Sequence, residues 1–380
     1  MDKEYPDNHL EDPPVNLFTD LITFFGGDYL IFPGITENGG YILSNLLATV
    51  YHWPDSKIPE KFKSNCNHAA LFILAISDEI AKRLGYNRYQ EGEAEENKIY
   101  FPDEAITKGM VIDYYQQVAH YILPYLKDRP QSLKRNPNGI LDKGFYHKDA
   151  GDAAPAWVKS IELYSDSAKK EIDYIICNDR QTLAYLNNLG CIELNPWNSR
   201  TKSLDKPDYL IIDLDPAEKN TFKQVIKTAL AFKVILDKAG ADCYCKTSGA
   251  TGLHIFIPMG KKYLYEQVKD FAHFLCIMVN EQLPDFTSLE RNLQKRGNNN
   301  IYLDYLQNRR GQTIAAAYSL RPHAGATVSM PLHWKEVKRG LKPSAFTIET
   351  ALPRIKRTGD IFSGVLGKGI DLKKCLEKLS

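Results

Sequence analysis

Residues 207–216 read Pro-Asp-Tyr-Leu-Ile-Ile-Asp-Leu-Asp-Pro, an apolar run of strand-forming residues that ends in two carboxylates. In a β-strand, residues two apart point to the same side, so Asp213 and Asp215 are expected to present paired carboxylates. Pro216 then breaks the strand, which places the pair at its C-terminal end. Because adjacent carboxylates repel unless a cation lies between them, the run predicts a Mg²⁺ or Mn²⁺ site.

The D-x-D pattern alone leaves several interpretations open. It occurs in phosphatases, glycosyltransferases and polymerases, and two solvated aspartates in a surface turn would produce it as well. The apolar run before the pair disfavours the surface turn. Pro216 and Ala217 depart from the D-x-D-x-[TV] pattern of aspartyl phosphatases, which disfavours that class.

Residues 247–254 (TSGATGLH) lie between two expected strands, 242–246 and 253–258. The hydroxyl of Ser248, backbone amides near Gly249 and the imidazole of His254 together suit a triphosphate. No G-K-[ST] follows, so this is not a Walker loop. An ordinary hairpin would account for the same residues.

Two further positions extend the predicted site. Asp304 stands in an otherwise apolar strand, 301–305, where a buried carboxylate needs a partner, and it could be a third metal ligand. Arg321 follows an expected strand at 315–320 and could clamp a phosphate.

Basic and aromatic residues gather upstream. Arg129 and Lys134 precede the pair Phe145 and Tyr146, and charge beside exposed rings is typical of nucleic-acid binding. The alternative is that one of the two rings belongs to the core, because neighbours in a strand point to opposite sides.

Composition limits the possible classes of protein. The 380 residues are 43% hydrophobic and 25% charged, which excludes a disordered chain, a collagen-like repeat and a coiled coil. No apolar run reaches the roughly 18 residues of a membrane helix and no leader is apparent, so we expect a cytoplasmic, nucleoid-associated protein without a membrane partner. Residues 1–96 hold 7 Lys+Arg and 16 Asp+Glu, a net of −9, whereas residues 97–380 have a net of +10. The basic part suggests a polyanion partner, although uneven solvated charge would look the same.

The chain divides into four expected regions. Residues 1–16 are predicted to be disordered, 17–89 mainly helical, and 90–97 an acidic linker. Residues 98–380 mix strands with helices, expected at 110–126, 182–189, 222–239, 265–281 and 372–379. This predicts the α+β (mixed α/β) class.

Six segments, taken in order, resemble the polymerase domain of bacterial DNA ligase D, a member of the archaeo-eukaryotic primase superfamily used in non-homologous end joining. They are FPDEAITK at 101–108, RP…LKR.PNG…FYHK at 129–148, IELNPWNSR at 192–200, DYLIIDLDP at 208–216, KTSGATGLHIFIP at 246–258 and YLDYLQN…YSLRPHAGATVSMPL at 302–332. The resemblance runs from about residue 97 to near the end. It implies a primase-like polymerase core with an RRM-like catalytic sheet.

The resemblance also implies a role for each matching residue. The metal carboxylates would be Asp213, Asp215 and Asp304, with two divalent cations, Mn²⁺ or Mg²⁺. The nucleotide would be bound by Lys134, Asn195, Ser248, Gly249, His254, Gln307 and Arg321. Lys98 and Lys108 would hold the 5′-phosphate of a downstream strand, and Phe145 and Tyr146 would stack on template bases.

The implied function is a DNA-dependent nucleotidyltransferase that extends 3′ ends and fills gaps, preferring ribonucleotides, during end joining. Asn195 and Thr251 depart from the family, which commonly has His and Lys there, and we expect altered nucleotide affinity. No K-x-D-G ligase motif is present, so a separate ligase, together with Ku, would be a partner besides NTP or dNTP and DNA with gaps or 5′-phosphate ends. The alternative is a catalytically weak end-binding module that recruits other repair proteins.

Overall fold

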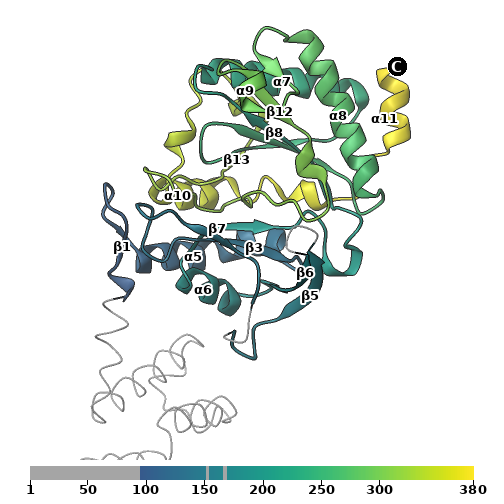
Figure 1. The fold of residues 1–380 in the computed structure, drawn as a ribbon. Helices are drawn as coiled ribbons and strands as arrows, with labels where there is room; N and C mark the ends of the chain where they lie inside the picture. Colours follow the sequence, from purple (N-terminus) through teal and green to yellow (C-terminus); the bar gives the residue numbers. More distant parts are fainter. Residues whose placement is uncertain (1–94, 151–153, 166–168) are drawn as a thin grey trace, which may run out of the picture. The chain divides into compact units, whose positions relative to one another are not determined.

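The apolar run at 207–216 forms the central strand of a six-stranded sheet in the computed structural model, which describes residues 95–150, 154–165 and 169–380 (Figure 1). The strand order is β11-β12-β8-β10-β9-β13, and every pairing is antiparallel except that of β11 with β12. The strands are β8 (Tyr209–Asp215), β9 (Tyr244–Thr247), β10 (Leu253–Pro258), β11 (Thr287–Ser288), β12 (Ile301–Asp304) and β13 (Pro331–Leu332). The expectations for 1–16, 17–89 and the first residues of the linker lie outside the described residues.

The two faces of β8 have different neighbours. Leu210, Ile212 and Leu214 pack in the same core as helices α7 (Phe222–Ala239) and α8 (Tyr265–Gln282), which cover one face of the sheet in Figure 1. Residues of the opposite parity on β8 share a different core with the second sheet described below. Because the side chains alternate, the carboxylates at 213 and 215 point toward that second sheet.

The second sheet has three strands in the order β4-β3-β7 and is packed with α5 and α6 in the lower half of Figure 1. Its elements are β3 (Gln131–Arg135), β4 (Phe145–His147), β7 (Cys191–Pro196), α5 (Lys108–Leu126) and α6 (Arg180–Asn188). Two hairpins adjoin it, β1 (Ile99–Phe101) with β2 (Ile106–Thr107) and β5 (Ser160–Ser165) with β6 (Lys170–Ile175). The remaining α-helices of the described residues are α9 (Leu293–Arg296), α10 (Ile348–Thr358) and α11 (Leu372–Leu379).

A buried ion pair joins the two sheets near the start of β8. Arg129, fully buried between α5 and β3, donates to the carboxylate of Asp208, which immediately precedes β8. The same guanidinium donates to the carbonyl of Asn198 at 2.7 Å, and Arg200 Nε reaches Asp208 at 2.9 Å. Arg129 is therefore a structural residue, and its inclusion among the basic residues for nucleic acid was wrong.

The strand expected at 315–320 is also wrong. Tyr318 has a φ of 69°, in the left-handed region that an extended strand does not use. Leu320 makes an isolated bridge with Val328, and no ladder forms over this segment. The segment is a loop that carries Arg321 toward β9 and β10.

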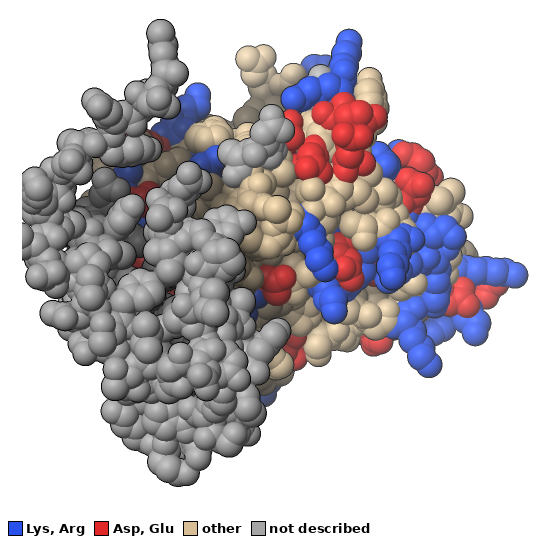
Figure 2. Space-filling view, turned by 90° about the horizontal axis from the view of Figure 1, so that it is seen from below, with Lys and Arg blue, Asp and Glu red and all other residues tan. Residues whose placement is uncertain are grey.

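Surface charge is mixed on the face shown in Figure 2. Lys and Arg side chains gather on the right of the view, with Asp and Glu interspersed among them. The described residues visible on this face therefore form no continuous basic track for a polyanion. None of the helices within the described ranges is long and apolar enough to cross a membrane.

Candidate active site

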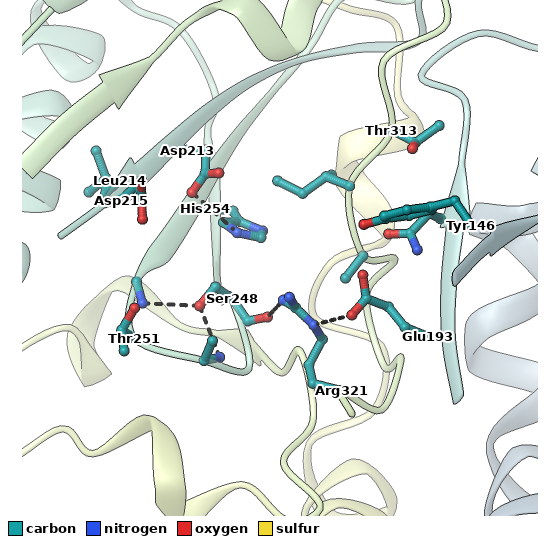
Figure 3. Close-up of a pocket in the computed structure, with 15 residues that line it drawn as sticks. Tyr146, Glu193, Asp213, Leu214, Asp215, Ser248, Thr251, His254, Thr313 and Arg321 are labelled. Carbon is teal, nitrogen blue, oxygen red and sulfur yellow. Dashed lines mark hydrogen bonds and ion pairs between the residues drawn. The ribbon is translucent and has the colours of Figure 1, made fainter. Parts of the chain in front are cut away.

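A cavity of ≈ 210 Å³ lies between the two sheets and collects most of the polar residues that the sequence singled out. In Figure 3, Asp213, Asp215 and His254 lie on one side, and Tyr146 and Glu193 lie on the other. Its polar lining also includes Asn195, Ser248, Thr251, Thr313 and Arg321. The predicted residues Lys134, Gly249, Gln307 and Asp304 are not among those that line it.

Sheet register aligns the chemical groups in one row. Asp213 on β8 is paired with Asp304 on β12 on one side and with His254 on β10 on the other. His254 is in turn paired with Lys246 on β9. Because directly paired residues point to the same face, all four side chains rise from one face of the sheet.

Asp304 is oriented by its own chain. Its two carboxylate oxygens accept hydrogen bonds from the amide of Leu306 at 2.8 Å and from Nε2 of Gln307 at 3.0 Å. Gln307 thus contacts the carboxylate of Asp304, the residue beside which the sequence analysis placed it. Its other amide atom, Oε1, is buried without a hydrogen-bond partner among the described residues.

The carboxylates lack a cation that would balance them fully. Burial, followed by the charges of Asp304 and Asp215, raises the pKa of Asp213 to about 7. Burial also raises the pKa of Asp215, although Arg296 opposes that shift. Carboxylate oxygens are the ligands that Mg²⁺ and Mn²⁺ prefer, so this donor set fits divalent ions.

As they stand, no three His, Cys, Asp or Glu residues in the described part of the chain lie close enough together to hold a metal ion. The carboxylate of Asp215 instead faces Arg296, whose Nη2 lies 3.6 Å from Oδ2. Sequence reasoning missed Arg296. The guanidinium is buried over the ring of Tyr302, and its Nε and Nη1 have no hydrogen-bond partner among the described residues. The only sequence signal was its place shortly before the Asp304 strand.

The turn at 247–252 is built around the hydroxyl of Ser248. This oxygen accepts the amides of Ala250 and Gly252, both at 3.0 Å (Figure 3). The sequence suggested that amides of this turn would point toward a phosphate, but these two donate to Ser248 instead. With its lone pairs engaged, the Ser248 hydroxyl keeps its hydrogen to donate.

Arg321 is held against this turn. It donates to the backbone carbonyl of Ser248 and, at 2.7 Å through Nε, to Glu193 on β7 (Figure 3). Gly249 has a φ of 75°, and a Cβ there would lie 2.5 Å from Arg321 Cγ. Only glycine allows this close approach. Glu193 was missed as a functional residue, although the segment 192–200 contains it.

His254 is neutral in this setting. Burial, together with the nearby charges of Lys246 and Arg321, lowers the pKa of His254 well below its usual value. Its Nε2 lies 3.4 Å from Oδ1 of Asp213. The imidazole can therefore offer one N–H donor and one acceptor nitrogen, but no charge.

The far side of the cavity carries the predicted stacking residues. Phe145 and Tyr146 are 48% and 61% exposed, so neither ring is a core residue. Arg135 lies over the ring of Phe145 and Lys134 over that of Tyr146, with centroid distances of 5.4 and 5.0 Å. β4 is an edge strand of its sheet, and both rings remain partly exposed beside these cations.

Asn195 is buried on β7 and lines the cavity. Its Nδ2 has no hydrogen-bond partner among the described residues. A buried unpaired amide donor is costly, which is consistent with a ligand atom as its partner.

Lys98 and Lys108 lie together but outside the cavity. The amide of Lys108 donates to the carbonyl of Lys98 at 2.8 Å, and Lys98 Nζ contacts Asn138. Lys108 is only 2% exposed, and its Nζ pairs with Glu95 at 2.9 Å.

Comparisons with known proteins show the family to which this chain belongs. Residues 107–362 match the family model described as LigD, primase-polymerase domain. The bifunctional non-homologous end joining protein LigD of Bacillus subtilis is 34% identical over 264 residues, which cover 69% of this chain and 42% of the relative. The multifunctional LigD of Pseudomonas aeruginosa is 28% identical over 237 residues, covering 62% of this chain and 28% of the relative.

Among solved structures, the polymerase domain of Mycobacterium tuberculosis ligase D, in complex with DNA, superposes with a TM-score of 0.67 at 24% identity. It covers 73% of this chain and 98% of that domain, and it shows the fold. The class is therefore a primase-polymerase domain with the expected α+β core. The chain belongs to the LigD primase-polymerase family of non-homologous end-joining repair proteins, and it spans less than half the length of the curated relatives named above.

Proposed function

We propose that this chain is a DNA-dependent nucleotidyltransferase, which extends DNA 3′ ends and fills gaps during the repair of double-strand breaks. The observation that carries the proposal is the row formed by Asp304, Asp213 and His254 on one sheet face, with the cavity above it. Pure DNA binding gives no reason to keep Asp304 and Asp215 where the charges of both raise the pKa of Asp213. This disfavours the alternative of an end-binding module with vestigial catalysis.

The carboxylates of Asp213, Asp215 and Asp304 would hold two divalent cations, Mn²⁺ or Mg²⁺. When bound, such ions lower the pKa of a primer 3′-hydroxyl and offset charge on the nucleotide phosphates. Positioning and electrostatics supply most of the catalysis in phosphoryl transfer, so the placement of the remaining side chains matters as much as the ions do.

The protein's own residues would orient the nucleotide. The Ser248 hydroxyl and the His254 imidazole donate to phosphate oxygens, and the Arg321 guanidinium, held by Glu193, pairs with them. Asn195 offers its unpaired amide to the same ligand. Lys134 and Gln307 act from just outside the cavity, Lys134 beside the ring of Tyr146 and Gln307 on the carboxylate of Asp304.

DNA would be contacted at two further places. Phe145 and Tyr146 stack on template bases, because exposed rings beside cations suit that contact. Lys98 and Lys108 hold a downstream 5′-phosphate. A ribonucleotide preference, a nucleoid location and cooperation with Ku and a separate ligase complete the proposal.

The test is primer extension on a gapped duplex. Substrates with a downstream 5′-phosphate or 5′-hydroxyl are compared, with ribonucleotides or deoxyribonucleotides, in Mn²⁺ or Mg²⁺. We expect metal-dependent addition that is stronger with the 5′-phosphate and with ribonucleotides.

The matched variants are Asp213→Ala and Asp242→Ala, the second at an exposed aspartate before β9. The first should abolish addition while DNA binding stays nearly intact, and the second should behave as wild type. Activity in Asp213→Ala would refute the metal assignment. Intact DNA binding without any addition by the wild type would favour the end-binding module.

A further inference from the structure

We propose that Lys246 is a positioning residue, which fixes the imidazole of His254 so that its Nε2–H points at the anionic ligand of the cavity. The proposal rests on the proposed function in one respect, namely that this ligand is a nucleoside triphosphate. It assigns a task to a lysine that neither lines the cavity nor contacts the ligand.

Lys246 occupies a position that a lysine seldom takes. It lies on β9, between β10 and the edge strand β13, directly paired with His254 on β10, and its side chain is 0% exposed. Its Nζ lies 2.8 Å from Nδ1 of His254 and 2.5 Å from Oγ of Ser329. A fully buried lysine is rare unless its nitrogen is engaged in this way.

The direction of each hydrogen bond follows from its neighbours. The Ser329 hydroxyl donates its only hydrogen to the carbonyl of Thr247 at 2.8 Å, so its oxygen must accept from Lys246. An ammonium group has donors and no acceptor, so Nδ1 of His254 must accept as well. Burial lowers the pKa of Lys246, whereas the nearby charge of Asp213 favours its ammonium form, and it is for the ammonium form that this direction is assigned.

The proton of the neutral imidazole is therefore on Nε2. This is the nitrogen on the carboxylate side, 3.4 Å from Oδ1 of Asp213, and the ring of His254 lines the cavity (Figure 3). With the other tautomer, a nitrogen lone pair would face the carboxylate and the phosphate oxygens. Lys246 thus turns His254 into a donor toward an anion rather than a repelling acceptor.

A double-mutant cycle separates this task from simple packing. Lys246→Met keeps the length of the side chain and removes the donor. In the wild-type background, we expect it to lower kcat/KM for nucleotide addition by roughly tenfold, the size of losing one buried hydrogen bond. In a His254→Ala background the same change should matter less than about twofold, because its target is gone.

The control is Lys223→Met, at an exposed lysine in the first turn of α7, which should leave both backgrounds unchanged. A lysine that only fills space would lower kcat/KM equally in both backgrounds, and that result would overturn the proposal. If the wild type itself adds no nucleotide, the proposed function fails. Failure of the nucleotidyltransferase proposal is thus distinguished from failure of the role proposed for Lys246.

A spectroscopic measurement on the wild-type protein keeps the proposal testable even if Lys246→Met does not fold. Histidine ¹⁵N NMR, with His254 identified by its loss in His254→Ala, reports which ring nitrogen carries the proton. We expect Nδ1 without a proton and Nε2 protonated. A wild-type spectrum with the proton on Nδ1 would overturn the assignment.

Discussion

Gly252 controls the distance between the 247–252 turn and the carboxylate strand, so a single added methyl group should disable catalysis. A Cβ at Gly252 overlaps the carbonyl oxygen of Leu214, the residue between Asp213 and Asp215, and lies 3.3 Å from its carbonyl carbon. Both neighbours are backbone, so relief requires a shift on the order of 1 Å. Overpacking of this kind costs about 1–3 kcal/mol of unfolding free energy. A misplacement of about 1 Å at a reacting centre can cost roughly 10²-fold in rate.

The assay is single-turnover nucleotide addition by Gly252→Ala, with denaturant unfolding measured in parallel. The matched control is Gly367→Ala, where the new Cβ would lie 2.9 Å from the carbonyl oxygen of Gly364. It introduces a milder overlap, also with a backbone carbonyl, in a turn that does not line the cavity. We expect both variants to lose stability and only Gly252→Ala to lose about 10²-fold in rate. A folded Gly252→Ala protein with the wild-type rate would refute the reasoning.

Two further predictions concern ion pairs. Glu95→Gln should raise affinity for gapped DNA with a 5′-phosphate by about two- to fivefold. In the wild type the exposed carboxylate of Glu95 competes with the phosphate for the buried Lys108, and such pairs are worth about 0.2–1 kcal/mol. Fluorescence anisotropy would measure it; Glu96→Gln serves as the control, and an equal gain with 5′-hydroxyl DNA would contradict the competition. Asp208→Asn should lower the unfolding free energy by about 3–5 kcal/mol, because Arg129 would keep a buried, uncompensated charge. Denaturant unfolding measures this free energy. If Asp208→Asn loses no more than the exposed control Asp205→Asn, the Arg129–Asp208 pair does not stabilise the packing of the two sheets.

Much of the catalytic sheet could be predicted because its signals are local. The helices at 222–239 and 372–379 and the strand at 253–258 have the predicted bounds. Period-two alternation was enough to pair Asp213 with Asp215, and Pro216 marked the end of the strand. The turn around Ser248 was placed correctly between two strands, although the direction of its amides was not.

What could not be predicted depends on register between distant strands. The contact of Lys246 with His254 requires β9 and β10 to pair in one register, and a slip of β9 by one residue would turn Lys246 to the other face of the sheet, away from His254. Glu193 reaches Arg321 across 128 positions of sequence, and no local pattern indicates that contact. The loop at 315–320 was misjudged because Tyr318 takes a left-handed φ, a conformation that propensity does not foresee for a tyrosine.

The same register explains why charged and polar groups are concentrated at the site. Four neighbouring strands place two carboxylates, an imidazole and a lysine in a single row, where each side chain has the next one as its lateral neighbour. Lys246 is buried most deeply at one end of the row, whereas Asp304 at the other end is fixed by its own loop. The unbalanced negative charge therefore concentrates at Asp213, in the middle of the row, and this is where incoming cations would be stabilised most.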